Sequence, residues 1–336
     1  FVKDDGSIKE YKADEYTLDN INNGKLLLLL YRVTLKEKYL KAANLLREQL
    51  RRQPRTKEGG FWHKKIYPNQ MWLDGLYMAG PFYAEYAWLS HEDTAFTDIG
   101  DQFIRMEKHA RDPKTGLLYH AWDESKQMKW ANARTGDSQN FWARAMGWYA
   151  CALVDALDYF PVSHPKRKAL IDILNRLVNA LEKQQDKQTG LWYDVMNYNR
   201  PGKEKNYFEA SASSQFIYAI AKGVRMGYLP AAKITIATKG YEGLINKFVK
   251  IENGQMNLYG TVKVSGLGGN PYRDGSFEYY MSEPVVMNDP KGIGAFLLAS
   301  NEMEMQRTLS GGNGETVSLD NFFNHELKQH VDTCSS

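Results

Sequence analysis

Asp74 is the residue of this 336-residue sequence whose surroundings best suit acid–base chemistry. It lies in segment 71–82, where the other residues are apolar, aromatic or small. Burial disfavours an ionised carboxylate and raises its pKa toward neutrality, as a general acid working near pH 7 requires. A helix cap is the structural alternative, but Asn69 is better placed to supply one. Because a lone acid among apolar residues is more often structural than catalytic, Asp74 needs support from other residues.

A second group combines one cation with two indoles. Arg144 and Trp148 are four residues apart, on one face of an expected helix, and Trp142 opens the same turn. A guanidinium can grip a carboxylate with two hydrogen bonds while indoles pack on a sugar ring, so this group suits an anionic sugar. The alternative is a core-facing aromatic stripe from which Arg144 extends to solvent. The spacing alone leaves both interpretations open.

Two histidines occupy similar settings, each after aromatic residues and before an apolar helix. A lone histidine is usually a satisfied hydrogen-bonding residue, but His63 and His120 at equivalent positions of two repeats favour a shared pocket. Asp19, in a polar loop before a helix over 25–33, is a turn or cap residue by default. It becomes a second active-site carboxylate if the fold closes over it. Asp137 is the runner-up acid, in a turn context typical of an N-cap.

An internal repeat organises the chain. Residues 112–119 recur as 186–193, with the same Asp, Thr and Gly spacing. Each such turn leads through an aromatic loop into a helix rich in small residues, and each is preceded by a longer amphipathic helix. The small-residue inner helices are expected to begin near 71, 142, 210 and 292, and the outer helices to span 37–53, 92–111, 164–186 and 229–250.

Stacked helix pairs form either an open solenoid or a closed α/α toroid. Long aromatic loops before the inner helices would crowd at one end of a toroid and build a pocket there, so we predict an all-α toroid. One catalytic domain over 1–305 is expected, with a C-terminal extension over 306–336 packing on it. Segment 256–282 is expected to be a long loop, with a β-rich segment as the alternative.

The composition excludes several classes of protein. A net charge of +3 with mixed signs carries no nucleic-acid footprint, and no apolar stretch approaches the 18 residues of a membrane span. Two cysteines, Cys151 and Cys334, do not make a disulfide framework, and no Cys or His spacing resembles a metal site. We therefore expect neither a metal nor another cofactor. The 13% aromatic content suits sugar binding as well as packing.

Taken together and in order, these motifs resemble glycoside hydrolase family 105, the unsaturated rhamnogalacturonyl hydrolases. The resemblance covers roughly residues 15–305. It is carried by segments 18–25, 60–64, 67–78, 119–124, 141–148 and 290–296, of which the segment around Asp74 is the most specific.

The resemblance implies a six-hairpin (α/α)6 toroid, of which this chain lacks a preceding helical stretch. It also implies that Δ4,5-unsaturated galacturonyl residues are removed by hydration of their vinyl-ether double bond. Asp74 would protonate C4 and activate the water that adds at C5. The remaining roles would be contacts with an acidic oligosaccharide: Arg144 to the uronate carboxylate, Trp142 and Trp148 to the ring, His63 and His120 to hydroxyls, and Asp19 orienting substrate or water. A cytoplasmic monomer is expected, with the periplasm as the alternative compartment.

Three other functions remain open from the sequence. One is the same chemistry on unsaturated glucuronyl residues, as from ulvan. Another is an ordinary glycosidase that pairs Asp74 with Asp19 and cleaves saturated substrates. The last is a toroid that binds acidic oligosaccharides without catalysis, although a carboxylate near a bound anion brings no benefit to a pure binder.

Overall fold

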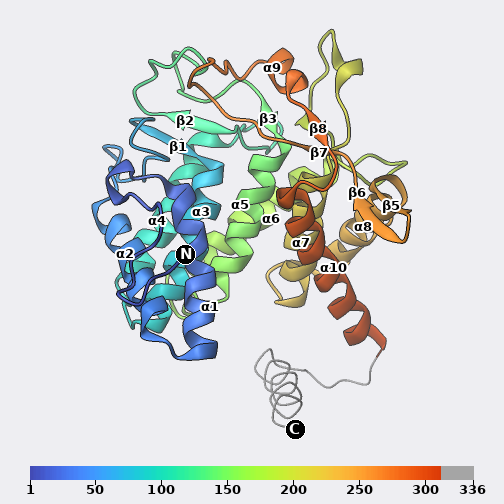
Figure 1. The fold of residues 1–336 in the computed structure, drawn as a ribbon. Helices are drawn as coiled ribbons and strands as arrows, with labels where there is room; N and C mark the ends of the chain where they lie inside the picture. The colour runs from blue at the N-terminus through green and yellow to red at the C-terminus, as the bar shows by residue number, and fades with distance from the viewer. Residues whose placement is uncertain (312–336) are drawn as a thin grey trace.

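The computed structural model describes residues 1–311, and helices dominate it. The inner helices are α1 (Gly24–Thr34), α3 (Leu73–Leu89), α5 (Ala143–Leu157), α7 (Ala210–Arg225) and α10 (Pro290–Gly311). Their outer partners are α2 (Glu37–Arg52), α4 (Ala95–Ala110), α6 (Arg167–Gln184) and α8 (Ile234–Phe248). A short α9 (Phe277–Ser282) lies over one end of the helices (Figure 1).

The inner helices follow one another side by side from α3 through α5 and α7 to α10, with α4, α6 and α8 outside them (Figure 1). The toroidal arrangement and the starting points of the helices agree with the repeat pattern in the sequence. The expected domain boundary at residue 305 falls inside α10, so the helix continues across it. The packing of a C-terminal extension concerns residues 312–336, which lie outside the described part.

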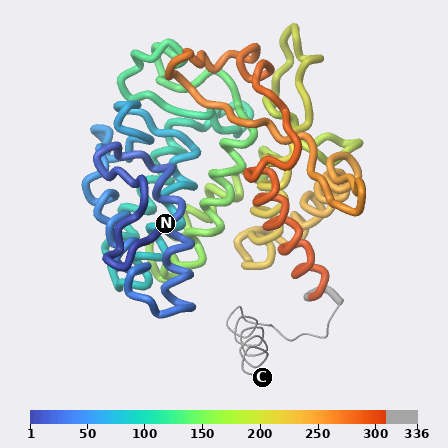
Figure 2. Tube along the Cα trace, viewed as in Figure 1, coloured from blue at the N-terminus to red at the C-terminus, as the bar shows by residue number. Residues whose placement is uncertain are grey.

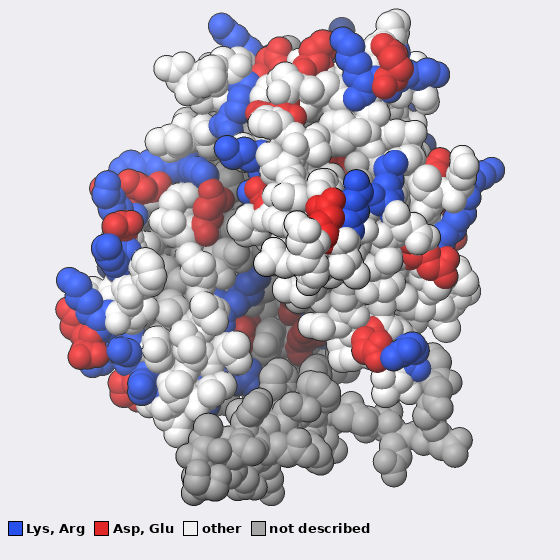
Figure 3. Space-filling model, turned by 45° about the vertical axis from the view of Figure 1, so that its right-hand side comes forward, with Lys and Arg blue, Asp and Glu red and all other residues white. Residues whose placement is uncertain are grey.

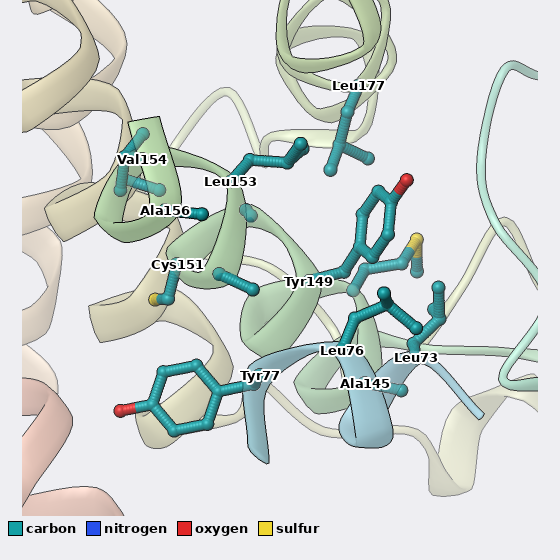
Figure 4. Packing of buried hydrophobic residues seen from close by; sticks show 14 of the residues in the cluster. Leu73, Leu76, Tyr77, Ala145, Tyr149, Cys151, Leu153, Val154, Ala156 and Leu177 are labelled. Carbon is teal, nitrogen blue, oxygen red and sulfur yellow. The ribbon is translucent and has the colours of Figure 1, made fainter. Parts of the chain in front are cut away.

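Burial explains why the inner helices carry so many small and apolar residues. Nearly every side chain of α5 is buried, and most of them are small or apolar, with Arg144 and Asp155 as the charged exceptions. Figure 4 shows Leu73 and Leu76 of α3 next to Ala145 of α5, with Tyr149 and Leu177 beyond them. A Cβ on Gly147 would lie 2.1 Å from a side-chain oxygen of Gln215 in α7, so only glycine permits this approach of two inner helices.

The repeated turns adopt one conformation. Asp112 and Asp186 each accept hydrogen bonds from the backbone N–H and the hydroxyl of the threonine three residues later. The glycine that follows, Gly116 or Gly190, has φ near +75° (76° and 74°), a region that favours glycine. Two copies of the sequence motif therefore give two copies of the same turn, each joining an outer helix to an aromatic loop.

Short antiparallel strand pairs stand at the end of the toroid where the inner helices begin. β1 (Gln70–Trp72) pairs with β2 (Ala121–Asp123), and β3 (Phe141–Trp142) pairs with β4 (Val195–Met196). The remaining pairs are β5 (Val249–Glu252) with β6 (Gln255–Leu258) and β7 (Thr261–Val262) with β8 (Val285–Val286). Segment 256–282 is thus neither a plain loop nor β-rich, because it holds two short strands, a crossing loop and α9.

Two surface properties bear on function. Basic and acidic side chains are interspersed on the face shown in Figure 3 rather than gathered by sign. None of the helices within residues 1–311 combines the length and apolar character needed to cross a bilayer.

Candidate active site

One backbone hydrogen bond recurs in four successive units at the strand end of the toroid. In each unit, the residue that begins a helix donates its N–H to a carbonyl further along the chain, and the residue that carries this carbonyl directly follows an aromatic residue. The bonds run from Leu18 to His63 (3.0 Å), from Leu73 to His120 (3.1 Å), from Ala143 to Asp194 (2.8 Å) and from Ala210 to Gly260 (2.8 Å). His63 and His120 therefore do occupy equivalent positions, as the sequence predicted, and Asp194 is their counterpart in the next unit.

In the first three of these units, the residue after the donor carries a side chain that acts on the side chain of the acceptor residue. Asp19 lies 3.6 Å from His63, Asp74 lies 3.1 Å from His120, and the charge of Arg144 lowers the pKa of Asp194, although other effects outweigh it. Strand pairing sets this geometry, because β1 and β3 each end one residue before their inner helix begins. The helix at Asp74 starts after Trp72 with no side-chain cap, so Asn69, which has a positive φ of 63°, is not the cap expected from the sequence.

Asp74 and His120 form the centre of the site. Oδ2 of Asp74 lies 3.1 Å from Nε2 of His120, and the Asp74 side chain is 14% exposed. Both of these buried atoms lack a well-aligned hydrogen-bond partner. On its other nitrogen, Nδ1, His120 meets the hydroxyl of Tyr280 at 2.9 Å. The Asp74 carboxyl therefore makes no structural hydrogen bond through Oδ2, and this oxygen can give or take a proton.

The pKa of Asp74 differs in direction from the sequence-based expectation. Burial raises the pKa of this carboxyl, but the nearby His120 and, less strongly, His63 outweigh burial, and the pKa lies below its usual value. The expectation of a raised pKa considered desolvation alone and is therefore wrong for the protein's own side chains. A negative charge brought next to Asp74 would act in the opposite direction and favour the protonated acid.

His63 lies on the other side of the site and is neutral. Its ring stacks on Trp72 (centroids 4.6 Å apart), and its Nε2 lies 3.6 Å from Asp19 Oδ1. Burial lowers the pKa of His63 to about 4, and Nδ1 has no hydrogen-bond partner. Asp19 is 42% exposed and forms an ion pair of 2.5 Å with Lys64. A neutral imidazole with a free nitrogen suits a hydrogen bond to a sugar hydroxyl.

Trp142 and Arg144 are deeply buried and already engaged. Trp142 Nε1 donates to Asp194 Oδ1 (3.0 Å), and its ring lies 4.7 Å from that of His120. Arg144 pairs with Glu209 (3.2 Å), donates to Ser211 (2.7 Å), and also donates to the carbonyl of Val262. With 1% of its surface exposed, Arg144 has less freedom to grip a substrate carboxylate than its spacing indicated.

Trp148 lies one turn further along α5 and is partly buried. Its ring packs against that of Tyr77 in α3 at a tilt of 35° (centroids 4.4 Å apart), and the Lys25 ammonium lies 4.1 Å from the centre of the Tyr77 ring. The expected pairing of Trp148 with Arg144 on one face is therefore replaced by a contact between two inner helices. Asp19, His63, Asp74, His120 and Trp142 come together in one series of contacts, whereas Trp148 belongs to a neighbouring one.

The sequence analysis missed three residues of the site: Trp72, Asp194 and Tyr280. Trp72 stacks on His63 and meets His120 edge-on (5.3 Å). Asp194 could have been found, because it follows Trp192 and Tyr193 as His120 follows Tyr119. Nothing in the sequence around Tyr280 signalled a role, since its partner is 160 residues away.

The runner-up acid occupies a different place. Asp137 lines a separate hollow of about 980 Å³, together with Tyr119, Trp122, Arg134 and Arg200. α5 begins six residues after Asp137, so this residue is not the N-cap that its turn context indicated.

Comparison with known proteins identifies the family. The sequence profile of glycosyl hydrolase family 88 matches residues 1–307. A solved glycoside hydrolase of family 105 from C. acetobutylicum is 52% identical, with a TM-score of 0.88, over 91% of this chain and 84% of that chain. This likeness confirms the (α/α)6-barrel fold predicted from the resemblance.

Two curated relatives cover shorter stretches. Protein Atu3128 of Agrobacterium fabrum is 36% identical over 232 residues, which are 67% of this chain and 97% of that protein. The unsaturated rhamnogalacturonyl hydrolase YesR of Bacillus subtilis is 32% identical over 210 residues, which are 61% of this chain and 57% of that protein. These likenesses support a glycosidase that acts on an unsaturated uronyl substrate. The chain belongs to glycosyl hydrolase family 88, and its resemblance to the enzymes of glycoside hydrolase family 105 is confirmed.

Proposed function

We propose that this protein removes a Δ4,5-unsaturated galacturonyl residue from the non-reducing end of lyase-cut rhamnogalacturonan. The observation that carries the proposal is Asp74, a buried carboxyl whose Oδ2 lies 3.1 Å from His120 and is not committed to a structural hydrogen bond. The printed name of YesR, an unsaturated rhamnogalacturonyl hydrolase at 32% identity, supports the choice of substrate.

The reaction adds water across the double bond between C4 and C5. Protonated Asp74 gives its proton to C4, and the resulting carboxylate takes a proton from the water whose oxygen bonds to C5. Asp74 is thereby returned to its protonated form. The hemiketal formed at C5 opens and releases the neighbouring sugar. A single carboxyl performs both proton transfers, so the paired carboxylates of ordinary glycosidases are not required.

The bound substrate favours the protonated form of Asp74, which the protein's own side chains do not favour. Its uronate carboxylate brings a negative charge into the site and its ring excludes water, and both effects raise the pKa of Asp74. Neutral His63 bonds to a sugar hydroxyl, and Trp142 contributes an aromatic surface beside His120. Arg144 attracts the substrate carboxylate through its positive charge, which lies next to Trp142 (guanidinium carbon 5.5 Å from the ring centre), because its guanidinium is not exposed for direct binding.

The test follows the ultraviolet absorbance of the conjugated double bond in unsaturated galacturonyl-rhamnose. We expect decay with the parent and with Asp137→Asn, whose carboxyl lines the separate hollow, and none with Asp74→Asn. The double bond removes the stereocentre at C4 by which galacturonyl and glucuronyl rings differ, so faster decay of unsaturated uronides from glucuronate-containing polysaccharides would assign a different linkage and leaving sugar to the substrate. Cleavage of saturated substrates would instead favour an ordinary acid–base glycosidase. Binding without decay of any unsaturated uronide would overturn the proposed enzyme activity.

A further inference from the structure

Tyr280 reaches the proposed active site from a distant part of the chain. It lies on α9, in the orange to red-orange segment that crosses over the strand end of the toroid in Figure 2. The residue is fully buried, and its hydroxyl lies 2.9 Å from Nδ1 of His120. Its ring also stacks on Trp142 (6.1 Å, 23° between planes). The contact thus fixes a crossing segment onto the histidine that faces Asp74.

Hydrogen-bond accounting decides which partner donates. Burial raises the pKa of the Tyr280 phenol well above its usual value, so the group keeps its single proton. Among the described residues, His120 Nδ1 is the acceptor that meets this hydroxyl. A buried O–H without an acceptor would lose about 1–3 kcal/mol, so the phenol donates to Nδ1. Nδ1 is then unprotonated, and the proton of a neutral His120 resides on Nε2.

The opposite arrangement is unfavourable at both ends of the ring. If Nδ1 carried the proton and donated to Tyr280, the phenol proton would be buried without an acceptor. The lone pair of Nε2 would then face Oδ2 of Asp74 at 3.1 Å, which repels a carboxylate. Both effects favour the same tautomer of His120.

We propose that Tyr280 is a positioning residue that holds His120 in its Nε2–H tautomer and thereby keeps the protonated nitrogen of the imidazole, rather than a lone pair, on the side that faces Asp74. This inference deepens the proposed function and rests on it for its catalytic consequence. When Asp74 gives its proton to C4, the Nε2–H stabilises the carboxylate that forms. Loss of the Tyr280 hydroxyl should therefore reduce kcat more than it changes KM.

The experiment compares Tyr280→Phe with Tyr279→Phe in full-length protein labelled with ¹⁵N-histidine. The neighbouring Tyr279 is a matched control, because its hydroxyl accepts a hydrogen bond from Gly266 N–H (3.0 Å) and does not touch His120. The His120 signals are assigned by their loss in His120→Gln. Nitrogen chemical shifts report which ring nitrogen carries the proton.

We expect the Nε2–H tautomer in the parent and in Tyr279→Phe, and a mixture of tautomers in Tyr280→Phe. With an active substrate, kcat of Tyr280→Phe should fall about three- to tenfold, as expected for one lost hydrogen bond, with KM within about twofold. An Nδ1–H tautomer in the parent, or an unchanged tautomer in Tyr280→Phe, would overturn the inference. Because the spectra need no turnover, they decide the role of Tyr280 even if no unsaturated uronide is hydrated.

Discussion

Two polar clusters place largely shielded carboxyl groups (14–25% of the side chain exposed) in opposite situations. In the Asp74 cluster (Asp74, His63 and His120), Asp74 Oδ2, His63 Nδ1 and His120 Nε2 are buried without a hydrogen-bond partner. In the Asp155 cluster (Asp155, Asp158, Tyr218 and Lys222), the same Asp155 oxygen accepts from Tyr218 (2.6 Å) and Lys222 (2.8 Å). Lys222 also binds Asp158 at 2.6 Å.

The difference separates a structural acid from one available for chemistry. Asp155 and Asp158 are compensated by an ammonium that is itself only 8% exposed, so removing one partner leaves buried charge behind. Asp74 keeps bonding capacity that the protein does not use, which is typical of functional sites and uncommon elsewhere. The absence of a partner is not decisive by itself, because Asp137 Oδ1 and Asp194 Oδ2 are also buried without one; Asp74 differs from both in that its free oxygen lies 3.1 Å from a histidine nitrogen.

The largest effect is expected from Asp74→Asn. Removing the group that transfers both protons should lower kcat on an unsaturated uronide by about 10³-fold. The free energy of unfolding should change by less than about 1 kcal/mol, because no aligned hydrogen bond is lost. Initial rates and urea unfolding of the same preparations check both values. In Asp155→Asn the pattern should reverse, with stability lowered and kcat of the folded enzyme kept within about threefold. Equal loss of activity in the two variants would remove the distinction between the clusters.

Lys222→Met tests the Asp155 cluster from its cationic side. The substitution leaves the partly buried Asp155 (18% exposed) and the more exposed Asp158 (25%) without their ammonium, and we expect the protein to lose up to about 3–5 kcal/mol of unfolding free energy. Lys233→Met is the matched control, since Lys233 binds Glu182 at 2.6 Å where that carboxylate side chain is 48% exposed. Such an exposed pair contributes about 0–1 kcal/mol. Urea unfolding at pH 7 compares the two variants. Equal losses of unfolding free energy would show that the burial of the ion pair does not determine its contribution.

Asp194→Asn extends the comparison to a third buried acid. Burial and the neighbouring Glu209 raise the pKa of Asp194 to about 8. Between about pH 4 and 8 the folded state binds a proton that the unfolded state has released, so the parent loses stability as pH rises through this window. The loss should amount to about 2–4 kcal/mol, and Asp194→Asn should remove it while keeping an acceptor for Trp142. Unfolding free energies at pH 5 and pH 8 test this prediction. Parallel pH dependence in both proteins would contradict it.

Asp19→Asn should lower activity far less than Asp74→Asn. Asp19 is 42% exposed, bound to Lys64, and 3.6 Å from His63, so its charge acts on the site indirectly. We expect kcat/KM to fall by about tenfold or less, in line with the loss of one charge-assisted contact. Rates measured beside those of Asp74→Asn give the comparison. Equally severe loss in both would restore the reading in which Asp19 and Asp74 work as an acid–base pair.

Local features of the fold could be predicted from the sequence because they depend on near neighbours. The Asp–Thr–Gly turns at 112–116 and 186–190 and the periods of the outer helices are encoded within a few residues of themselves. The domain boundary expected at residue 305 lies within α10, which runs to Gly311, and it stays a prediction.

For the site as well, features that depend on neighbouring residues could be predicted, whereas those that depend on distant residues could not. His63, Asp74 and His120 lie in recognisable motifs, and the structure brings them together. The engagement of Arg144 by Glu209, 65 residues away, does not follow from helical spacing. The lowered pKa of Asp74 depends on a histidine 46 positions later. Tyr280 depends on how a whole segment crosses the toroid. Such long-range contacts decide whether a pKa is raised or lowered and which charged groups pair, and neither can be derived from local sequence patterns.

The recurring bond from the start of a helix to a later carbonyl has a consequence for how such enzymes diversify. It fixes the backbone at positions 19, 74 and 144 in the same way, whatever side chain each carries. The toroid therefore presents an aspartate at two of these positions and an arginine at the third from equivalent backbone sites, and each side chain is matched by its own neighbours, as Arg144 is by Glu209. Substrate specificity can change through substitutions at these equivalent positions together with their neighbours, and a protein engineer can alter one position at a time.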